Sequence, residues 1–193
     1  MTHTATSHAV EYTGAKAVFA DVDDISGNIN IETVANVISN RTKGLIPVHM
    51  TGSPCDMDQL KNLCDEKNIL LIEDSAHSFG STLNKKFSGT FGNAGVYSYY
   101  STKAIFAGEG GVVVTDDNNI GNLMKDFIAY DRFKKKMNIG CNIRLSELQA
   151  LMIYSVVKEY AQIIKNKYLF EISLVEVSFL KIHQYVCLIY HHV

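Results

Sequence analysis

The chain of 193 residues is short of proline, of paired cysteines and of net charge. Two prolines against 13 glycines argue against a collagen-like or low-complexity chain. With 18 basic and 20 acidic residues, the net charge is −2. The sequence therefore lacks the excess of positive charge that is typical of a dedicated nucleic-acid-binding protein, and we expect no nucleic-acid partner.

Targeting and redox signals are also scarce. The four cysteines form no CxxC pair and no zinc-site spacing, so reduced, buried thiols in a cytosolic protein are the simplest interpretation. The first twelve residues contain neither the basic nor the apolar stretch of a signal peptide. No uncharged apolar run reaches the about 18 residues that a membrane span requires. We expect a cytoplasmic protein without a membrane partner.

Short apolar runs alternate with helical patterns along most of the chain, which is typical of an α/β fold. Strands are expected at 17–22, within 42–50, and at 69–72, 95–100 and 112–115. Helices are expected at 31–38, 57–66, 118–130 and 146–160. The continuous apolar run 69–72 predicts a strand that is buried on both faces. The fold class that follows is α/β, with a central, mostly parallel sheet flanked by helices.

No linker interrupts residues 1–168, which we interpret as one domain. The tail, residues 169–193, is rich in β-forming residues but has no clear period and no glycine or proline. Two interpretations of the tail stay open: a strand hairpin, or a segment that does not pack on the domain.

Three polar residues follow predicted strands, at the edge where open α/β sheets bind ligands. Asp74 follows the strand at 69–72, and His77 comes three residues later. Lys103 follows the strand at 95–100 and precedes a glycine-rich turn. Each residue alone is typical of a cap, a turn or a solvated surface. Together, a carboxylate, an imidazole and an amine indicate a cofactor that uses all three.

Pyridoxal phosphate (PLP) fits this combination. Its aldehyde forms a Schiff base with a lysine, and its pyridinium nitrogen needs a carboxylate to stay protonated. Its phosphate needs hydroxyls and backbone N–H groups at a turn or at a helix N-terminus. Ser98, Ser101 and Thr102 precede Lys103 and offer such hydroxyls.

Several blocks of sequence support this interpretation. They are GAKAVFADVD at 14–23, IPVH at 46–49, IEDSAH at 72–77, YSYYSTK at 97–103, GEGG at 108–111 and GCNIRLSELQA at 140–150. In this order and spacing they resemble the DegT/DnrJ/EryC1/StrS family of nucleotide-sugar aminotransferases, over about residues 2–168. The resemblance implies the large domain of fold type I, the aspartate aminotransferase fold.

The resemblance also implies roles for single residues. Lys103 corresponds to the lysine that forms the Schiff base and moves the substrate proton, and Asp74 to the partner of the pyridinium nitrogen. His77 corresponds to a residue that reaches the phenolic oxygen of PLP, and Ser98 to a phosphate ligand. We thus expect Lys103 and Asp74 to be the catalytic residues.

Two further residues complete the expected cofactor site. His3 lies where the family places a ring that stacks on the pyridine. Asn142 resembles a residue that reaches the phosphate bound by a neighbouring subunit, which implies a homodimer. No metal site is expected.

The function implied by the resemblance is transfer of an amino group, with L-glutamate as the expected donor, to a keto group of a nucleotide-linked deoxysugar. Such reactions serve polysaccharide and aminosugar biosynthesis. The family also has an upstream phosphate-binding loop and a C-terminal small domain that this sequence does not contain. Two alternatives follow: an inert remnant that at most binds a partner, or a sugar dehydratase. Lys103 disfavours the dehydratase, which carries histidine at that position.

Overall fold

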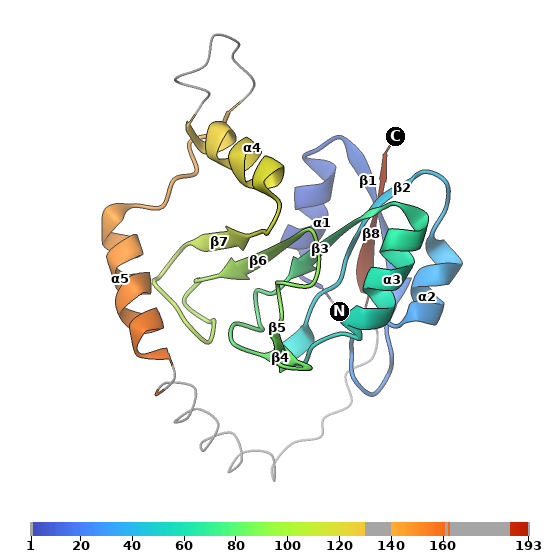
Figure 1. Ribbon diagram of the computed structural model, residues 1–193, viewed down its shortest axis with the longest axis horizontal. Coiled ribbons are helices and arrows are strands. Elements are labelled where there is room, and N and C mark those ends of the chain that lie inside the picture. The colour runs from blue at the N-terminus through green and yellow to red at the C-terminus, as the bar shows by residue number, and fades with distance from the viewer. Residues whose placement is uncertain (1, 130–139, 161, 163–185, 193) are drawn as a thin grey trace.

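A six-stranded sheet forms the centre of the molecule (Figure 1). The computed structural model describes residues 2–129, 140–160, 162 and 186–192. Across the sheet the strands are β1 (Ala15–Asp21), β8 (Val186–His192), β2 (Thr42–Ile46), β3 (Leu70–Asp74), β6 (Ala94–Ser98) and β7 (Gly111–Val114). Strands β1, β2, β3 and β6 run in one direction, and β8 and β7 run against them. The predicted α/β class with a mostly parallel sheet is confirmed.

The helices begin where short polar side chains can cap them. Asp56 accepts a hydrogen bond from the backbone N–H of Gln59, and Ser146 forms a capping box with Gln149. All four predicted helices are present, and a fifth, α1, occupies a segment for which no helix was predicted. The helices are α1 (Thr4–Glu11), α2 (Ile31–Val37), α3 (Met57–Lys67), α4 (Asn118–Ala129) and α5 (Glu147–Lys158).

The main apolar core lies between one face of the sheet and helices α2 and α3. Val34 of α2 and Leu60 of α3 pack with Leu45 of β2 and Leu71 of β3, and all four side chains are buried. Strand side chains alternate between the two faces of a sheet, so the neighbours of Leu71 point to the other side. There the sheet faces α1.

The prediction that the strand at 69–72 is buried on both faces is wrong. Leu70 is 49% exposed and Ile72 is only partly buried, whereas Leu71 is buried. The physical reason is that α2 and α3 cover only one face of β3. The opposite face lines a cavity, which a run of four apolar residues cannot reveal.

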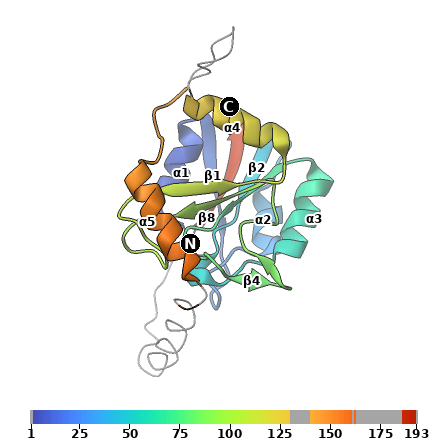
Figure 2. The same cartoon turned by 60° about the vertical axis from the view of Figure 1, so that its left-hand side comes forward.

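Residues 186–192 form β8, which lies between β1 and β2 (Figure 2). It pairs antiparallel with all seven residues of β1, from Ala15 with His192 to Asp21 with Val186. The end of the tail is thus an interior strand of the sheet, next to the edge strand β1. The preceding tail residues 169–185 lie outside the described residues.

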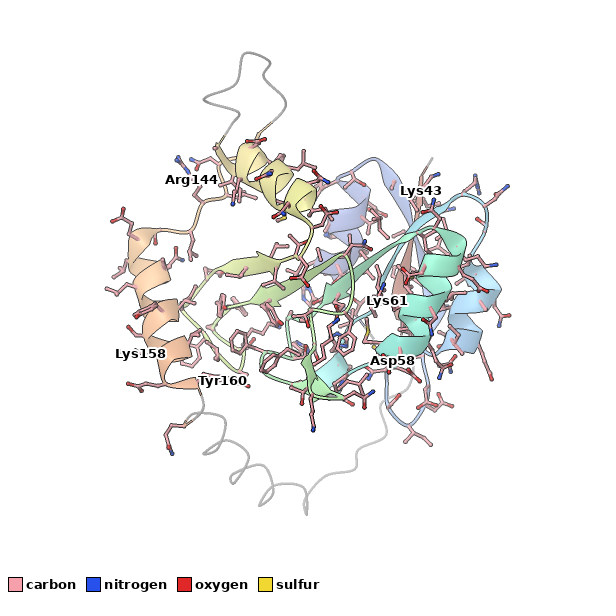
Figure 3. The ribbon with its side chains drawn as sticks, in the orientation of Figure 1. Lys43, Asp58, Lys61, Arg144, Lys158 and Tyr160 are labelled. Atoms are coloured by element: carbon pink, nitrogen blue, oxygen red, sulfur yellow. The ribbon has the colours of Figure 1, made fainter. Side chains whose placement is uncertain are left out.

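A small hairpin closes the loop after β3. Strands β4 (Thr82–Leu83) and β5 (Lys86–Phe87) flank Asn84 and Lys85, both with positive φ as in a type I′ turn. The side-chain amide of Asn84 donates to Asp58 of α3, which Figure 3 labels. A single 3-10 turn, η1 (Met50–Gly52), follows β2. None of the helices in the described ranges is long and apolar enough to cross a lipid bilayer.

Candidate active site

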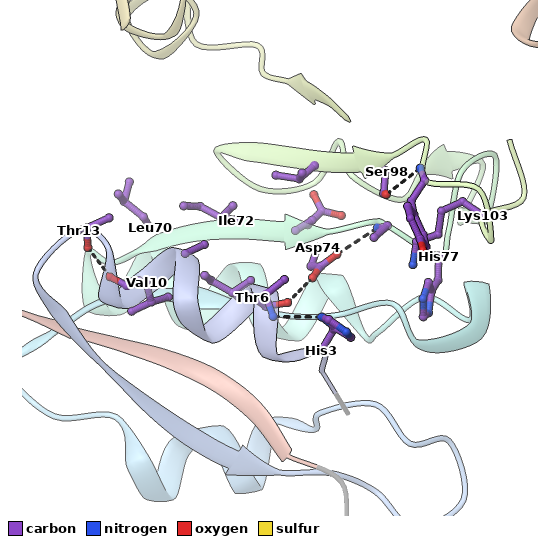
Figure 4. A pocket seen from close by; sticks show the side chains of 18 of the residues that line it. His3, Thr6, Val10, Thr13, Leu70, Ile72, Asp74, His77, Ser98 and Lys103 are labelled. Atoms are coloured by element: carbon purple, nitrogen blue, oxygen red, sulfur yellow. Dashed lines mark hydrogen bonds between the residues drawn. The ribbon is translucent and has the colours of Figure 1, made fainter. Parts of the chain in front are cut away.

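A cavity of about 1010 Å³ lies between α1 and the face of the sheet that α2 and α3 leave uncovered. Five of the six residues predicted to bind the cofactor line it: His3, Asp74, His77, Ser98 and Lys103. Figure 4 shows them gathered at one end, at the carboxyl ends of β3 and β6. The structure therefore brings these residues into one place, while their roles stay predictions.

Asp74 is the last residue of β3 and points into the cavity. Its Oδ2 atom accepts a hydrogen bond from the hydroxyl of Thr6 at 2.8 Å. Its Oδ1 atom accepts one from the backbone N–H of Ala76 at 3.1 Å. Both carboxylate oxygens thus have a donor from the protein, and each keeps a second lone pair for a ligand.

Lys103 follows β6 in a tight turn, in which its backbone N–H donates to the carbonyl of Tyr100 at 2.9 Å. The hydroxyl of Ser98 accepts a hydrogen bond from the backbone N–H of Tyr100. Thr102 also lines the cavity, whereas Ser101 is not among its described lining residues. A hydroxyl-bearing residue and a lysine therefore both line the cavity at the carboxyl end of β6.

His77 shows that the charges at this end of the cavity influence one another. Burial lowers the pKa of His77 below its usual 6.5, and the Lys103 ammonium and His3 lower this pKa further. The Asp74 carboxylate partly opposes the decrease in pKa. His77 therefore favours its neutral form beside a cationic lysine, and a neutral imidazole can accept or donate a hydrogen bond.

His3 has a structural task as well as a place at the cavity. It is the N-cap of α1, and its Nδ1 atom accepts a hydrogen bond from the backbone N–H of Ala5 at 3.1 Å. A backbone N–H can only donate, so Nδ1 carries no proton in this arrangement. The cap holds the imidazole ring at the end of the cavity where Asp74 and His77 lie (Figure 4).

Asn142 lies apart from the other predicted residues. It is exposed in the segment before α5 and is not among the described residues that line the cavity. Its predicted contact is with a neighbouring subunit, so that role stays a prediction.

A second polar cluster lies directly behind Asp74, on the other face of β3. The Glu73 carboxylate is fully buried and accepts hydrogen bonds from the backbone N–H groups of Gly89, Phe91 and Gly92 at 2.6–2.7 Å. Its Oε2 atom also lies 3.0 Å from Nε2 of buried His49. We call these five residues the Glu73 cluster.

The Glu73 cluster connects β3, which carries Asp74 at the cavity, to the loops behind it. The Nδ1 atom of His49 accepts from the backbone N–H of Cys55, so Nε2 carries the proton and donates to Glu73. Burial raises the pKa of Glu73, but the hydrogen bonds from His49, Gly92 and Gly89 lower it more, and the net pKa is below 4.5. The cluster therefore ties two loops to β3 beneath Asp74.

Sequence reasoning missed the wall that α1 contributes. Thr6 and Val10 of α1 line the cavity, as do its N-cap His3 and Thr13, which follows the helix; these positions are three or four residues apart. The helical period was the signal that could have found them. It was hard to see because α1 has only one buried residue, Val10.

No group of histidine, cysteine and acidic side chains in the described part of the chain could hold a metal ion. Cys55 and Cys64 are buried and form no disulfide, as expected, whereas Cys141, which also forms none, is exposed and not buried as predicted. Burial, and next the Asp65 carboxylate, raises the pKa of Cys64 to about 11, so this thiol is unreactive near neutral pH. The described residues that line the cavity include the ionisable side chains of Lys103, Asp74, His3 and His77.

Comparison with known proteins connects this geometry to a family. The model of the DegT/DnrJ/EryC1/StrS aminotransferase family matches residues 1–172. A GDP-perosamine synthase of Escherichia coli O157:H7 is 33% identical over 171 residues, which are 86% of this chain and 47% of that protein. The helices and strands of solved relatives superpose on this chain as well.

Two solved structures illustrate the range of chemistry among the neighbours. DesI, solved in the presence of its TDP-sugar product, matches 84% of this chain and 42% of its own, with a TM-score of 0.78 and 34% identity. The dehydratase ColD, solved with bound GDP-perosamine, matches 72% of this chain and 42% of its own, with a TM-score of 0.67 and 27% identity. The chain spans less than half the length of each of these relatives.

Proposed function

Because the chain belongs to the DegT/DnrJ/EryC1/StrS aminotransferase family, we propose that its cavity binds PLP and supports amino transfer to a nucleotide-linked ketosugar. The expected amino donor is L-glutamate. The names of the relatives support the sugar class: GDP-perosamine synthase is one, and DesI was solved with a TDP-sugar. The side chains that line the cavity support the assignment of PLP as the cofactor.

The side chains at the cavity fit the chemical groups of PLP. When bound, PLP supplies an aldehyde for a lysine and an electron-withdrawing ring whose nitrogen must stay protonated. Lys103 offers the amine and, once free, a base that takes a proton from the substrate carbon. Asp74 offers an acceptor for the ring nitrogen, and Ser98 offers a hydroxyl to the phosphate.

The observation that carries the proposal is the convergence of Lys103, Asp74 and His77 on one cavity. Lys103 and Asp74 are 29 positions apart in the sequence, yet both act on the pKa of His77. A lone lysine or aspartate at a strand end is common, but an amine, a carboxylate and an imidazole that line one cavity suit a cofactor with three matching groups. Lys103 also favours amino transfer over dehydration, since the dehydratases of the family are expected to carry histidine there.

Reductive trapping tests the proposal directly. The purified chain is incubated with PLP, reduced with borohydride and digested, and the modified lysine is identified by mass spectrometry. Lys103 is expected to carry the label, and Lys103→Ala is expected to lose it. Lys43→Ala is the matched control, because Lys43 also lines the cavity but lies at the start of β2, which runs parallel to β3, whereas Asp74 ends β3. Figure 3 labels Lys43.

Label spread over Lys85, Lys86 and other exposed lysines would contradict a PLP site at Lys103. Turnover is measured separately, by adding L-glutamate to the PLP-loaded chain and following the conversion of PLP to pyridoxamine phosphate. Label at Lys103 without this conversion would support the cofactor site and reject amino transfer by this chain.

A further inference from the structure

The helix α1 reaches the site through a contact that the proposed function does not use. The hydroxyl of Thr6 donates to Oδ2 of Asp74 at 2.8 Å, across 68 positions of sequence. Both side chains line the cavity and both are partly buried. Figure 4 shows the hydroxyl aimed at the carboxylate from the far wall of the cavity.

We infer that Thr6 is a positioning residue for Asp74: it holds the carboxylate in the orientation in which it accepts the pyridinium N–H of PLP. This inference rests on the proposed function. It concerns the way in which the chain prepares Asp74, which is separate from the question of whether PLP binds.

The hydrogen-bond inventory of Asp74 explains why a second donor matters. The backbone N–H of Ala76 alone would hold Oδ1 and leave the carboxyl group free to turn about its Cβ–Cγ bond. With Thr6 on Oδ2, both oxygens are held and the plane of the carboxylate is set. A preset acceptor loses less conformational freedom when a charged ligand arrives.

The placement of Thr6 is itself secured at the start of α1. His3 caps this helix, and Thr6 lies in its first turn, three residues later. The backbone N–H of Thr6 donates to the carbonyl of His3 at 3.0 Å. The helix start thus places a ring and a hydroxyl on the same side of the cavity, and only the hydroxyl reaches Asp74.

Replacement of Thr6 by valine removes the hydroxyl at nearly constant shape. In the PLP-loaded Thr6→Val chain we expect PLP affinity to fall about 10-fold, the loss of one hydrogen bond to a charged group. We also expect the ring nitrogen to lose its proton about one pH unit lower than in the parent. Loss of a donor by itself makes a carboxylate more basic, so a lower midpoint reports that the carboxylate is no longer held in orientation. The nitrogen is followed by NMR with ¹⁵N-labelled PLP across pH.

Conservative rescue and a matched control separate positioning from general damage. Thr6→Ser keeps the donor and should restore both affinity and the pH midpoint. Thr4→Val makes the same change on the exposed side of α1 and should leave both unchanged. If Thr6→Val does not fold, Thr6→Ala removes the same donor and is read in the same way.

A double-mutant cycle on the PLP-free chain measures the contact without the cofactor. Thr6→Val, Asp74→Ala and the double variant are unfolded in urea, and the unfolding constants are expected to show a coupling of about 2- to 10-fold. Alanine is used at position 74 because asparagine would keep an oxygen that accepts from Thr6. Absence of coupling would overturn the inference, because the contact would then contribute nothing. Coupling with an unchanged pH midpoint would overturn it as well, since Thr6 would then only hold α1.

The two proposals fail in different ways. If the parent chain binds no PLP while the cycle shows coupling, the proposed cofactor site is rejected, and with it the role of Thr6 toward PLP. If the parent binds PLP at Lys103 and Thr6→Val behaves like the parent, only the inference about Thr6 is rejected.

Discussion

Glu73 and Asp74 are adjacent in β3, but the fold uses their carboxylates in opposite ways. Glu73 points into the protein, is fully buried and accepts four hydrogen bonds. Asp74 points into the cavity, is partly buried and accepts two. The alternation of strand side chains puts one on each face. A carboxylate whose lone pairs are all used can only support the structure, whereas one with lone pairs to spare can bind a ligand.

The surroundings of the two carboxylates follow the same division. The loop that donates to Glu73 is packed so closely that a Cβ on Gly95 would overlap the backbone of Gly89, and one on Gly92 would overlap the carbonyl of Leu71. The side of Asp74 opens on about 1010 Å³ of cavity. The same two consecutive residues therefore join a rigid support to an open site.

Removal of each charge should give the largest contrast. Glu73→Gln places an amide N–H₂ among buried donors, and we expect it to reduce the free energy of unfolding by about 3–5 kcal/mol. Asp74→Asn keeps one acceptor in a partly open site, and a loss of about 1 kcal/mol is expected. Urea unfolding of both variants measures the difference. Equal losses would show that both carboxylates are structural.

Backbone packing beneath the site should give the next largest effect. Gly95→Ala forces a Cβ against the Gly89 backbone and should cost about 1–3 kcal/mol of stability. Gly121→Ala in α4 meets only Thr115 Cγ2 at 3.8 Å and should instead stabilise by about 0.5–1 kcal/mol. Thermal unfolding compares them, and a neutral Gly95→Ala would mean that the loop yields easily.

PLP should stabilise the chain only through the cavity beside Asp74. PLP at ten times its dissociation constant should stabilise the parent chain by about 1.4 kcal/mol, because it binds the folded state. The same PLP concentration should not stabilise Lys103→Ala to this extent. Differential scanning fluorimetry with and without PLP measures both, with Lys43→Ala as the control that keeps the stabilisation. An equal shift in Lys103→Ala would place the ligand elsewhere.

Lowering the pH should destabilise the Glu73 side and the cavity side over different pH ranges, and these changes in stability should be the smallest of those predicted. The folded-state pKa of Glu73 is below its usual 4.5, so its contribution to stability is complete above that pH and is lost as pH falls through the folded value. The pKa of His77 is below 6.5, so stability falls as pH drops from 6.5 toward that lowered pKa. Urea unfolding from pH 7 to pH 3 measures both losses.

Matched variants assign each loss. Glu73→Gln should remove the loss of stability that occurs below about pH 4.5. His77→Gln should remove the weaker loss of stability that occurs between pH 6.5 and pH 4.5. The His77 ring is partly desolvated, but the residue as a whole is exposed, so solvent screens its contribution to stability. A parent chain whose stability does not change between pH 6.5 and pH 5 would contradict the assignment to His77.

Much of this protein follows from local sequence. The caps Asp56 and Ser146, the apolar runs of the strands and the turn at Gly108–Gly111 define their elements within a few residues of chain. Asp74, His77 and Lys103 were found because each follows a predicted strand, and the carboxyl ends of parallel strands meet at one edge. The hydrophobic period and the alternation of strands with helices can be recognised in the sequence, so these features could be predicted from it.

The rest depends on contacts between distant segments. The link of Thr6 to Asp74 joins positions 68 apart, His49 meets Glu73 across 24, and β8 enters the sheet between β1 and β2 from the far end of the chain. Nothing in IEDS says which of its two carboxylates is buried, because that depends on which face α2 and α3 cover. Local propensity determined the elements, whereas packing decided which face became core and which became cavity.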